Sequence, residues 1–128
     1  MEGFEKVTTR KIIQRGPSGA STVLPNRYME DNELYRGSPM VTGCSQDYKK
    51  LFIVVKGRPI TFTREIVIPI KEYGMGIHCI KSEKRNHTYP IITIPQKWME
   101  ENNLKPGDSI DIFRTPQKDC LVIVPTQS

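Results

Sequence analysis

The sequence predicts a mainly β protein with short helices, and three observations support this fold class. Ten prolines and nine glycines punctuate the 128 residues, which favours short strands and turns over long helices. Short runs rich in Ile, Val and Thr, such as 60–70 and 120–124, are typical of strands. The third observation is a repeat, because two stretches of the chain become alike when one is shifted by 70 positions.

The repeat aligns residues 22–55 with residues 92–125 without a gap. Nine of the 34 aligned positions are identical, whereas chance would give about two, at roughly one identity in sixteen positions. In the first stretch the identical residues are Pro25, Met29, Glu30, Asn32, Leu34, Gly37, Leu51, Ile53 and Val54. This agreement predicts that the two stretches fold in the same way.

Each stretch reads as strand, short helix, strand, turn and strand. Pro25 and Pro95 follow short apolar runs and suit the first turn of a helix, so we expect helices at 26–34 and 96–104. Residues 109–113 then alternate polar and apolar side chains, as a half-buried strand does. A turn and a strongly apolar strand complete each stretch.

The repeat divides the chain into three parts. A first unit covers 6–55 and includes a basic first strand, and a second unit covers 81–126. The segment 56–80 between them has no counterpart at this offset and looks like a β-hairpin linker. Its last residues, 77–80, suit either the return strand of that hairpin or the first strand of the second unit.

Composition narrows the possible partners. Lysine and arginine number 19 against 14 acidic residues, and the formal net charge of +5 favours polyanionic partners. No apolar run approaches the roughly 20 residues that a membrane-spanning helix needs, so no membrane association is expected. The N-terminal residues lack the apolar stretch of a signal peptide, which predicts an intracellular, cytoplasmic protein.

No pattern in the sequence predicts an enzyme, a cofactor or a metal site. The three cysteines form no CxxC pair, so neither a disulfide framework nor a four-cysteine zinc site is expected. The neighbours His78 and Cys79 would point to opposite faces of a strand, which disfavours a shared metal. The acidic pairs at 30–31 and 100–101 lack a partner for acid–base catalysis.

The repeated aromatic position and the cysteines are expected to be structural. Tyr28 and Trp98 occupy the same place in the two stretches, and we expect them in the core rather than as platforms for stacking bases. Cys44, Cys79 and Cys120 are expected to be small core residues, since Cys120 opens an apolar strand.

Residues 92–125 resemble the SpoVT-AbrB family of small DNA-binding domains. The second unit matches the family pattern at Ile94-Pro95, Leu104, Gly107-Asp108, Ile110, Ile112 and 121–123. The first unit keeps Leu24-Pro25, Leu34 and Gly37 but has Ser38 in place of the aspartate. The resemblance covers about two-thirds of the chain and leaves 56–80 outside it.

The resemblance implies that two units interleave their hairpins into one swapped-hairpin β-barrel. A single unit of about 45 residues buries too little surface to be stable alone. The two tandem units of this chain therefore pair either with each other, as an intrachain pseudo-dimer, or with their equivalents in a second chain, as a homodimer. We favour the intrachain pairing, because the linker holds the units at a high effective concentration.

The resemblance also implies that double-stranded DNA is the partner and that basic residues of the first strands and turns grip it. The predicted DNA-binding residues are Arg10, Lys11, Arg15, Ser18, Arg27, Lys81, Lys84, Arg85, Asn86 and Lys97. The same 70-residue offset places Lys81, Lys84, Arg85 and Asn86 in the second unit, and Glu83 lies among them. The predicted function is that of a transcriptional regulator associated with the nucleoid.

An alternative is a protein-interaction module of antitoxin type, because antitoxins use this same fold. The usual toxin-blocking tail would follow the last strand, where only Gln127 and Ser128 occur. The segment 56–80 is then the candidate partner surface. Tandem units of this kind are familiar from archaea and their viruses, so the resemblance points to such a source.

Overall fold

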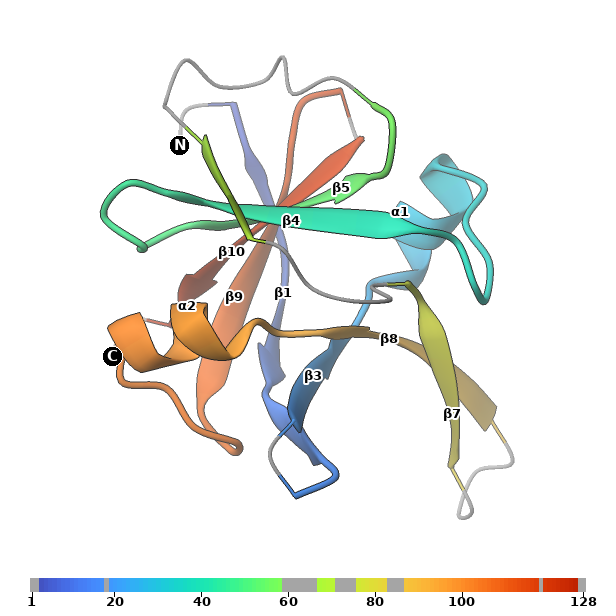
Figure 1. The fold of residues 1–128 in the computed structure, drawn as a ribbon. Helices are drawn as coiled ribbons and strands as arrows, with labels where there is room; N and C mark the ends of the chain where they lie inside the picture. Colours follow the sequence, from blue (N-terminus) through green and yellow to red (C-terminus); the bar gives the residue numbers. More distant parts are fainter. Residues whose placement is uncertain are drawn as a thin grey trace.

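The computed structural model describes residues 3–17, 19–58, 67–70, 76–82, 87–117 and 119–126, without the side chains of 67–70, 78–82 and 87. Within these ranges the chain is mainly β with two six-residue helices, which confirms the predicted fold class at this level (Figure 1). In chain order the elements are β1 (Glu5–Lys11), β2 (Ile13–Arg15), β3 (Gly19–Val23), α1 (Asn26–Asp31), β4 (Met40–Ser45), β5 (Leu51–Val55), β6 (Val67–Ile70), β7 (His78–Ser82), β8 (His87–Thr93), α2 (Gln96–Glu101), β9 (Ser109–Arg114) and β10 (Cys120–Pro125).

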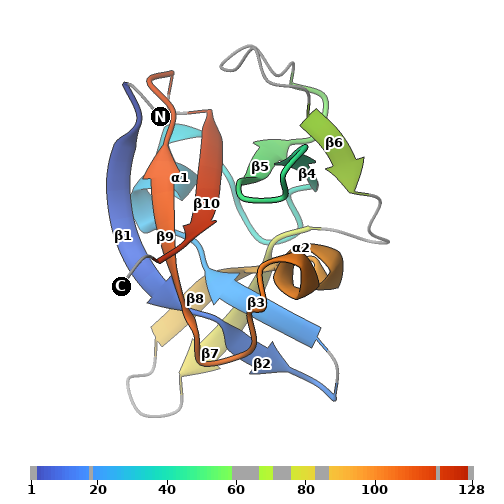
Figure 2. The same ribbon diagram turned by 90° about the vertical axis from the view of Figure 1, so that its left-hand side faces the viewer.

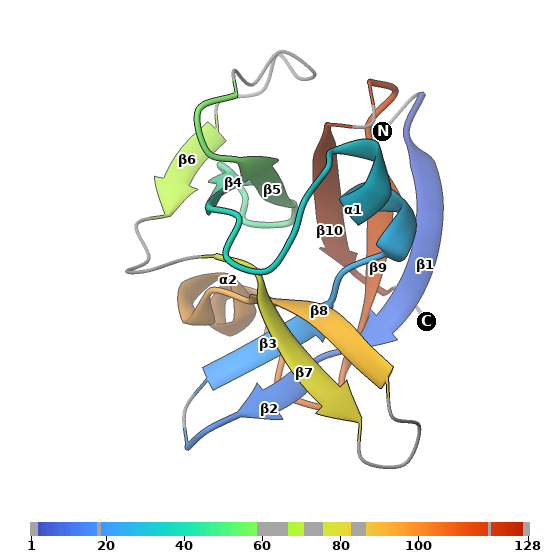
Figure 3. The ribbon, with the colours of Figure 1, turned by 90° about the vertical axis from the view of Figure 1, so that its right-hand side faces the viewer.

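The strands form two sheets. The larger sheet has the order β1-β9-β10-β5-β4-β6, and the smaller has the order β2-β3-β8-β7. The larger sheet bends so that β1, β9 and β10 stand on one side and β5, β4 and β6 on the other, with the smaller sheet beneath them (Figures 2 and 3). Since β1 and β6 are its two edges, no pairing among the described strands closes this sheet into a barrel.

Three strand pairs join the first unit of the chain to the second. β1 pairs with β9 from Glu5 opposite Arg114 to Lys11 opposite Ser109. The last strands of the two repeated stretches, β5 and β10, also pair, and so do β3 and β8. All of these pairs are antiparallel. The stretches 22–55 and 92–125 are therefore interlocked through both sheets.

The two helices begin and end in the same way. Pro25 and Pro95 precede them with φ of −63° and −61°. Glu33 and Asn103 take φ of 52° and 53°, and the next residue, a leucine, donates its N–H to the carbonyl of the methionine five residues earlier at 2.9 Å. A bond of this kind is typical of a Schellman closure. It explains why each helix ends three residues before the position that the sequence predicts.

Each helix lies against the hairpin turn of the other stretch. The side-chain amide of Asn102, just after α2, donates to the carbonyl of Tyr48 in the β4–β5 turn at 2.7 Å. The hydroxyl of Tyr28, in α1, donates to the carbonyl of Asp119 in the β9–β10 turn at 3.4 Å. Figures 2 and 3 show α2 below β4 and β5, and α1 beside β9 and β10. The helices thus strengthen the connection that the strands make.

The core is built from both halves of the chain. Trp98 is 0% exposed and Tyr28 1%, which confirms that this pair of aromatic residues is structural. Cys44 and Cys120 are also buried, as expected, whereas the side chain of Cys79 lies outside the described set. Burial raises the pKa of both buried thiols, so they stay protonated near neutral pH.

The described strands of the segment 56–80 do not form the hairpin that we expected. β6 pairs with β4 in the larger sheet, whereas β7 pairs with β8 in the smaller one. Of the two roles left open for 77–80, pairing with β8 is the one observed. The reason is that β6 satisfies its backbone hydrogen bonds along the edge of β4, so β7 is not its partner. Residues 59–66 and 71–75 lie outside the described ranges.

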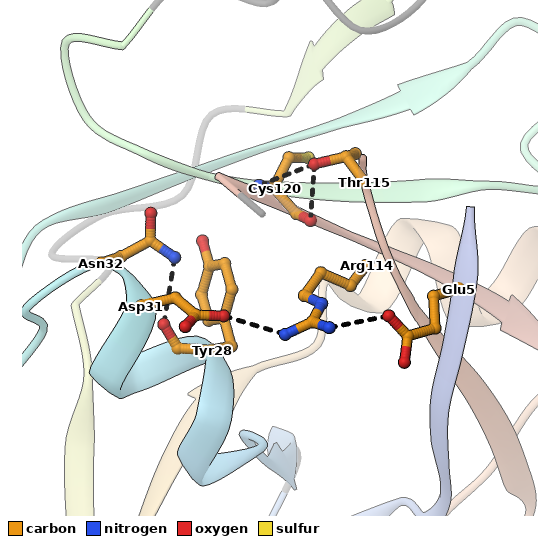
Figure 4. A network of polar contacts seen from close by, with 7 residues as sticks. All are labelled: Glu5, Tyr28, Asp31, Asn32, Arg114, Thr115 and Cys120. Atoms are coloured by element: carbon orange, nitrogen blue, oxygen red, sulfur yellow. Dashed lines mark hydrogen bonds and ion pairs between the residues drawn. The ribbon is translucent and has the colours of Figure 1, made fainter. Parts of the chain in front are cut away.

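Arg114 ties three elements together (Figure 4). Its side chain is 7% exposed, and its guanidinium donates to Glu5 of β1 at 2.7 Å and to Asp31 of α1 at 2.9 Å. The hydrogen bond to Glu5, together with the charges of both carboxylates, raises the pKa of Arg114. One side chain of β9 therefore fixes the first strand and the first helix.

Replacing Arg114 with methionine is expected to lower the free energy of unfolding by about 1–3 kcal/mol. Methionine keeps an apolar stem but leaves the partly buried carboxylate of Asp31, 27% exposed, without its cation. Urea unfolding followed by circular dichroism measures the change. Glu5→Gln is the matched control, because the side chain of Glu5 is 61% exposed and its loss should cost less than about 1 kcal/mol. Equal losses of unfolding free energy in the two variants would show that the Arg114–Asp31 pair stabilises the fold no more than the exposed Arg114–Glu5 pair does.

Candidate nucleic-acid interface

The smaller sheet carries two hairpins, β2–β3 and β7–β8, that extend away from the larger sheet (Figure 1). β3 and β8 are antiparallel neighbours, with Ser21 opposite Thr93 and Val23 opposite Ile91. The turns of the two hairpins therefore lie at opposite ends of the smaller sheet, as Figure 3 shows. Both hairpins nevertheless extend to the same side of the larger sheet, and we call β2–β3 the first arm and β7–β8 the second arm.

The first hairpin has a tight turn. Arg15 is opposite Gly19 at its end, and Gly16 has φ of 69°. A Cβ atom on Gly19 would lie 2.5 Å from the carbonyl oxygen of Arg15, so this position requires glycine. Such a turn lets the backbone approach a flat or grooved ligand closely. Ser18, a predicted contact residue, lies outside the described residues.

Three predicted contact residues gather where β1 leads into this hairpin. Arg10 and Lys11 end β1, and Arg15 ends β2; all three side chains are exposed. Within the described ranges none of the three forms an ion pair, so their charges are available to a partner. Arg10 and Lys11 are neighbours in β1, so their side chains project from opposite faces of the sheet.

The third cation of β1 is already engaged. Lys6 Nζ lies 3.4 Å from a carboxylate oxygen of Asp111 in β9. A 2.6 Å hydrogen bond from Thr9 lowers the pKa of Asp111, and a bond from Thr126 and the charge of Lys6 act in the same direction. The run from Lys6 to Arg15 contains no acid in the sequence, but the fold brings one beside it from a distant strand.

The helices place the two flanking candidates differently. Arg27 is exposed and has no ion-pair partner within the described part of the chain. Lys97, by contrast, lies 4.0 Å from Glu101 and has its ammonium 5.6 Å from the centre of the Tyr48 ring. Contacts of this kind compete with a ligand, so Lys97 is the weaker candidate of the two.

The 70-residue offset is wrong for the second arm. Ile12 donates its N–H to the carbonyl of Asp108 and accepts from Gly107; Ile77 makes the same two bonds with Ser38 and Gly37. Ile12 and Ile77 are therefore equivalent, which is an offset of 65. The physical reason is that the β7–β8 arm contains five more residues than the β2–β3 arm, and a chain gains length most easily at a hairpin turn.

The corrected register moves the predicted cations of the second arm. Gly76 and Ile80, not basic residues, stand where Lys11 and Arg15 stand in the first arm. Lys81 pairs with Thr88 one step further along the hairpin, and its side chain lies outside the description. Lys84, Arg85 and Asn86 lie outside the described residues altogether.

A cleft of about 440 Å³ separates the first hairpin from α2. Gln14, Pro17 and Gly19 line it on the hairpin side, and Gln96 and Lys105 on the other. Neither Gln14 nor Lys105 is among the contact residues that the sequence predicts. The strand pairing between the two halves brings them together, and no local pattern in the sequence signals it.

The same described ranges contain neither a metal-binding cluster nor a membrane-spanning helix. No group of three His, Cys, Asp or Glu side chains that could hold a metal ion occurs in the described part of the chain. Among the described residues, neither helix has the length and apolar character needed to cross a membrane. The exposed cations beside the first hairpin are therefore the strongest candidate for a functional site.

Comparison with known proteins gives a family match over part of the chain. The family model described as antidote-toxin recognition MazE, bacterial antitoxin, matches residues 90–128. This region contains most of β8, α2, β9 and β10, and it includes the residues that carry the SpoVT-AbrB resemblance. No curated protein and no solved structure matches the chain. Residues 90–128 are thus similar to a MazE-type antitoxin domain, in keeping with an AbrB/MazE-like β fold.

Proposed function

We propose that the chain is a DNA-binding protein that acts as a transcriptional regulator and contacts duplex DNA through its two hairpin arms. The proposal rests on Arg10, Lys11 and Arg15, which are exposed and form no ion pair with the residues that the structure describes. Lysine and arginine are the groups that neutralise phosphates, and arginine also takes the edges of guanine in the major groove. The net charge of +5 attracts a polyanion from a distance.

The architecture that supports this function is, in our proposal, a pair of tandem AbrB-like units that swap hairpins within one chain. The pairing of β1 with β9, of β5 with β10 and of β3 with β8 supports it. Each of these contacts is made inside the chain, so the monomer presents both arms without a second copy. The protein then works as a non-enzymatic regulator without a cofactor, in the cytoplasm beside the nucleoid.

A titration of the purified protein against random-sequence duplex DNA, followed by fluorescence anisotropy, tests this function. Three phosphate contacts give a slope of about −2.7 for log affinity against log salt, so an increase from about 50 to 200 mM salt should weaken binding about 40-fold. Binding at low salt is expected to be in the micromolar range. Absence of binding at 50 mM would remove the DNA proposal.

The MazE match favours a second candidate, a module that binds a toxin protein. In this case the described strand β6 and its neighbours in the segment 56–80 form the partner surface, and the arms serve only as structure. The two candidates differ in the titration above, because a pure antitoxin module would show no salt-dependent DNA binding. It would instead form a stoichiometric complex with a co-expressed toxin on size-exclusion chromatography.

A further inference from the structure

The two arms are unequal in length. Ile12 and Ile77 are equivalent anchors, since both bond to the loop that follows a helix. Beyond Ile12 the first arm stays paired as far as Arg15, three residues on, whereas beyond Ile77 the second stays paired as far as Ser82, five residues on. At roughly 3.3 Å per strand residue, the paired part of the second arm reaches about 7 Å further.

The extra length is comparable with the size of a DNA groove. The major groove of B-DNA is about 8.5 Å deep, and it admits a two-stranded β-ribbon. An arm about 7 Å longer than its partner can therefore approach base edges while the shorter arm rests at the level of the phosphates. The difference arises from two additional residue pairs, Lys81 with Thr88 and Ser82 with His87.

The chemistry of the arms differs as well. The first arm has one cation at its root, Lys11, and one beside its turn, Arg15. At the equivalent positions the second arm has Gly76 and Ile80, which cannot hold a phosphate by charge. Its extension instead adds an ammonium, two hydroxyls and an imidazole, which are groups that hydrogen-bond to base edges.

We propose that the protein recognises an asymmetric DNA site, in which the β2–β3 arm holds the phosphate backbone and the β7–β8 extension reads bases. This inference rests on the proposed DNA-binding function and assigns a different role to each arm. Proteins with two equal recognition elements read palindromes, because the symmetry of the site mirrors that of the protein. Two unequal arms on one chain lead to a site without a palindrome.

Selection of preferred sequences from a random duplex pool by the wild-type chain tests the asymmetry directly. We expect a preferred motif whose two halves differ. A palindromic motif, or DNA binding without any preferred sequence, would overturn the inference while leaving the proposed function intact. Failure of the wild type to bind any DNA at low salt would instead remove the proposed function, so the two failures are distinguishable.

A shortened arm tests which residues read the bases. Deleting Lys81, Ser82, His87 and Thr88 removes two residues from each strand and keeps the alternation of side chains. We expect affinity for random DNA to change less than about threefold and preference for the selected motif to fall roughly tenfold or more. An unchanged preference would overturn the assignment. Lys81→Ala, with unfolding compared to wild type, gives the same test if the deletion variant does not fold.

Discussion

Reversal of three charges, Arg10, Lys11 and Arg15 to glutamate, is expected to weaken binding to random duplex DNA by about two to three orders of magnitude at 0.1 M salt. Each lost phosphate contact removes about 0.9 from the slope of log affinity against log salt, so the slope should fall by about three. These side chains are exposed and unpaired within the described ranges, so the change should leave the fold intact. An anisotropy series over several salt concentrations measures both quantities.

A matched variant separates the site from the net charge. Lys49, Lys50 and Lys56 lie in the β4–β5 turn and just after β5, away from the smaller sheet (Figure 1). Their reversal to glutamate changes the net charge by the same amount, and we expect a loss of only a few fold, because charges more than a Debye length of about 10 Å from the bound DNA are screened. Equal losses would show that charge alone governs binding and that the assigned site is wrong.

Replacing Trp98 with alanine is expected to lower the free energy of unfolding by about 3–5 kcal/mol. The side chain is 0% exposed and belongs to the central cluster that both halves of the chain build. Its indole Nε1 has no hydrogen-bond partner among the described residues, so the loss reflects packing. A loss of this size is a large share of the total of about 5–15 kcal/mol typical of a domain. Urea unfolding must be followed by circular dichroism, since this is the single tryptophan of the chain.

Tyr35→Ala is the control for this substitution. Tyr35 is a large aromatic residue that is 70% exposed, so its truncation should change the free energy of unfolding by less than about 0.5 kcal/mol. The comparison isolates the effect of burial from that of removing an aromatic ring. Similar losses for the two variants would contradict the placement of Trp98 in the core.

The sequence predicts much of the local structure correctly. The repeated prolines, glycines and apolar strands place α1, α2 and the strands around them within a few residues. The helices are shorter than expected, because Glu33 and Asn103 adopt the left-handed conformation and redirect the following N–H. Such a choice depends on how the end of the helix packs, which periodicity alone does not show.

Prediction was weaker for the arms and for the segment between the units. A fixed offset assumes equal loop lengths, and five extra residues in the second arm shift every position before its turn. The pairing of β6 with β4 was not predicted, because the apolar sequence of β6 favours a strand without specifying its partner strand. The exposure of Arg10, Lys11 and Arg15 could be predicted from their charge. The ion pair between Lys6 and Asp111 could not, because it depends on the pairing of β1 with β9.

The pairing of β1 with β9 has a consequence for how the chain is made. Glu5 and Arg114 are joined across 109 residues, so the first strand emerges from the ribosome long before its partner. Contacts so distant in sequence close slowly, in milliseconds to seconds for domains rich in them. During synthesis we therefore expect the apolar strand β5 to remain without its partner β10 until the last hairpin has emerged. Because three strand pairs join the two units, we expect neither unit to complete its sheets before the other is made.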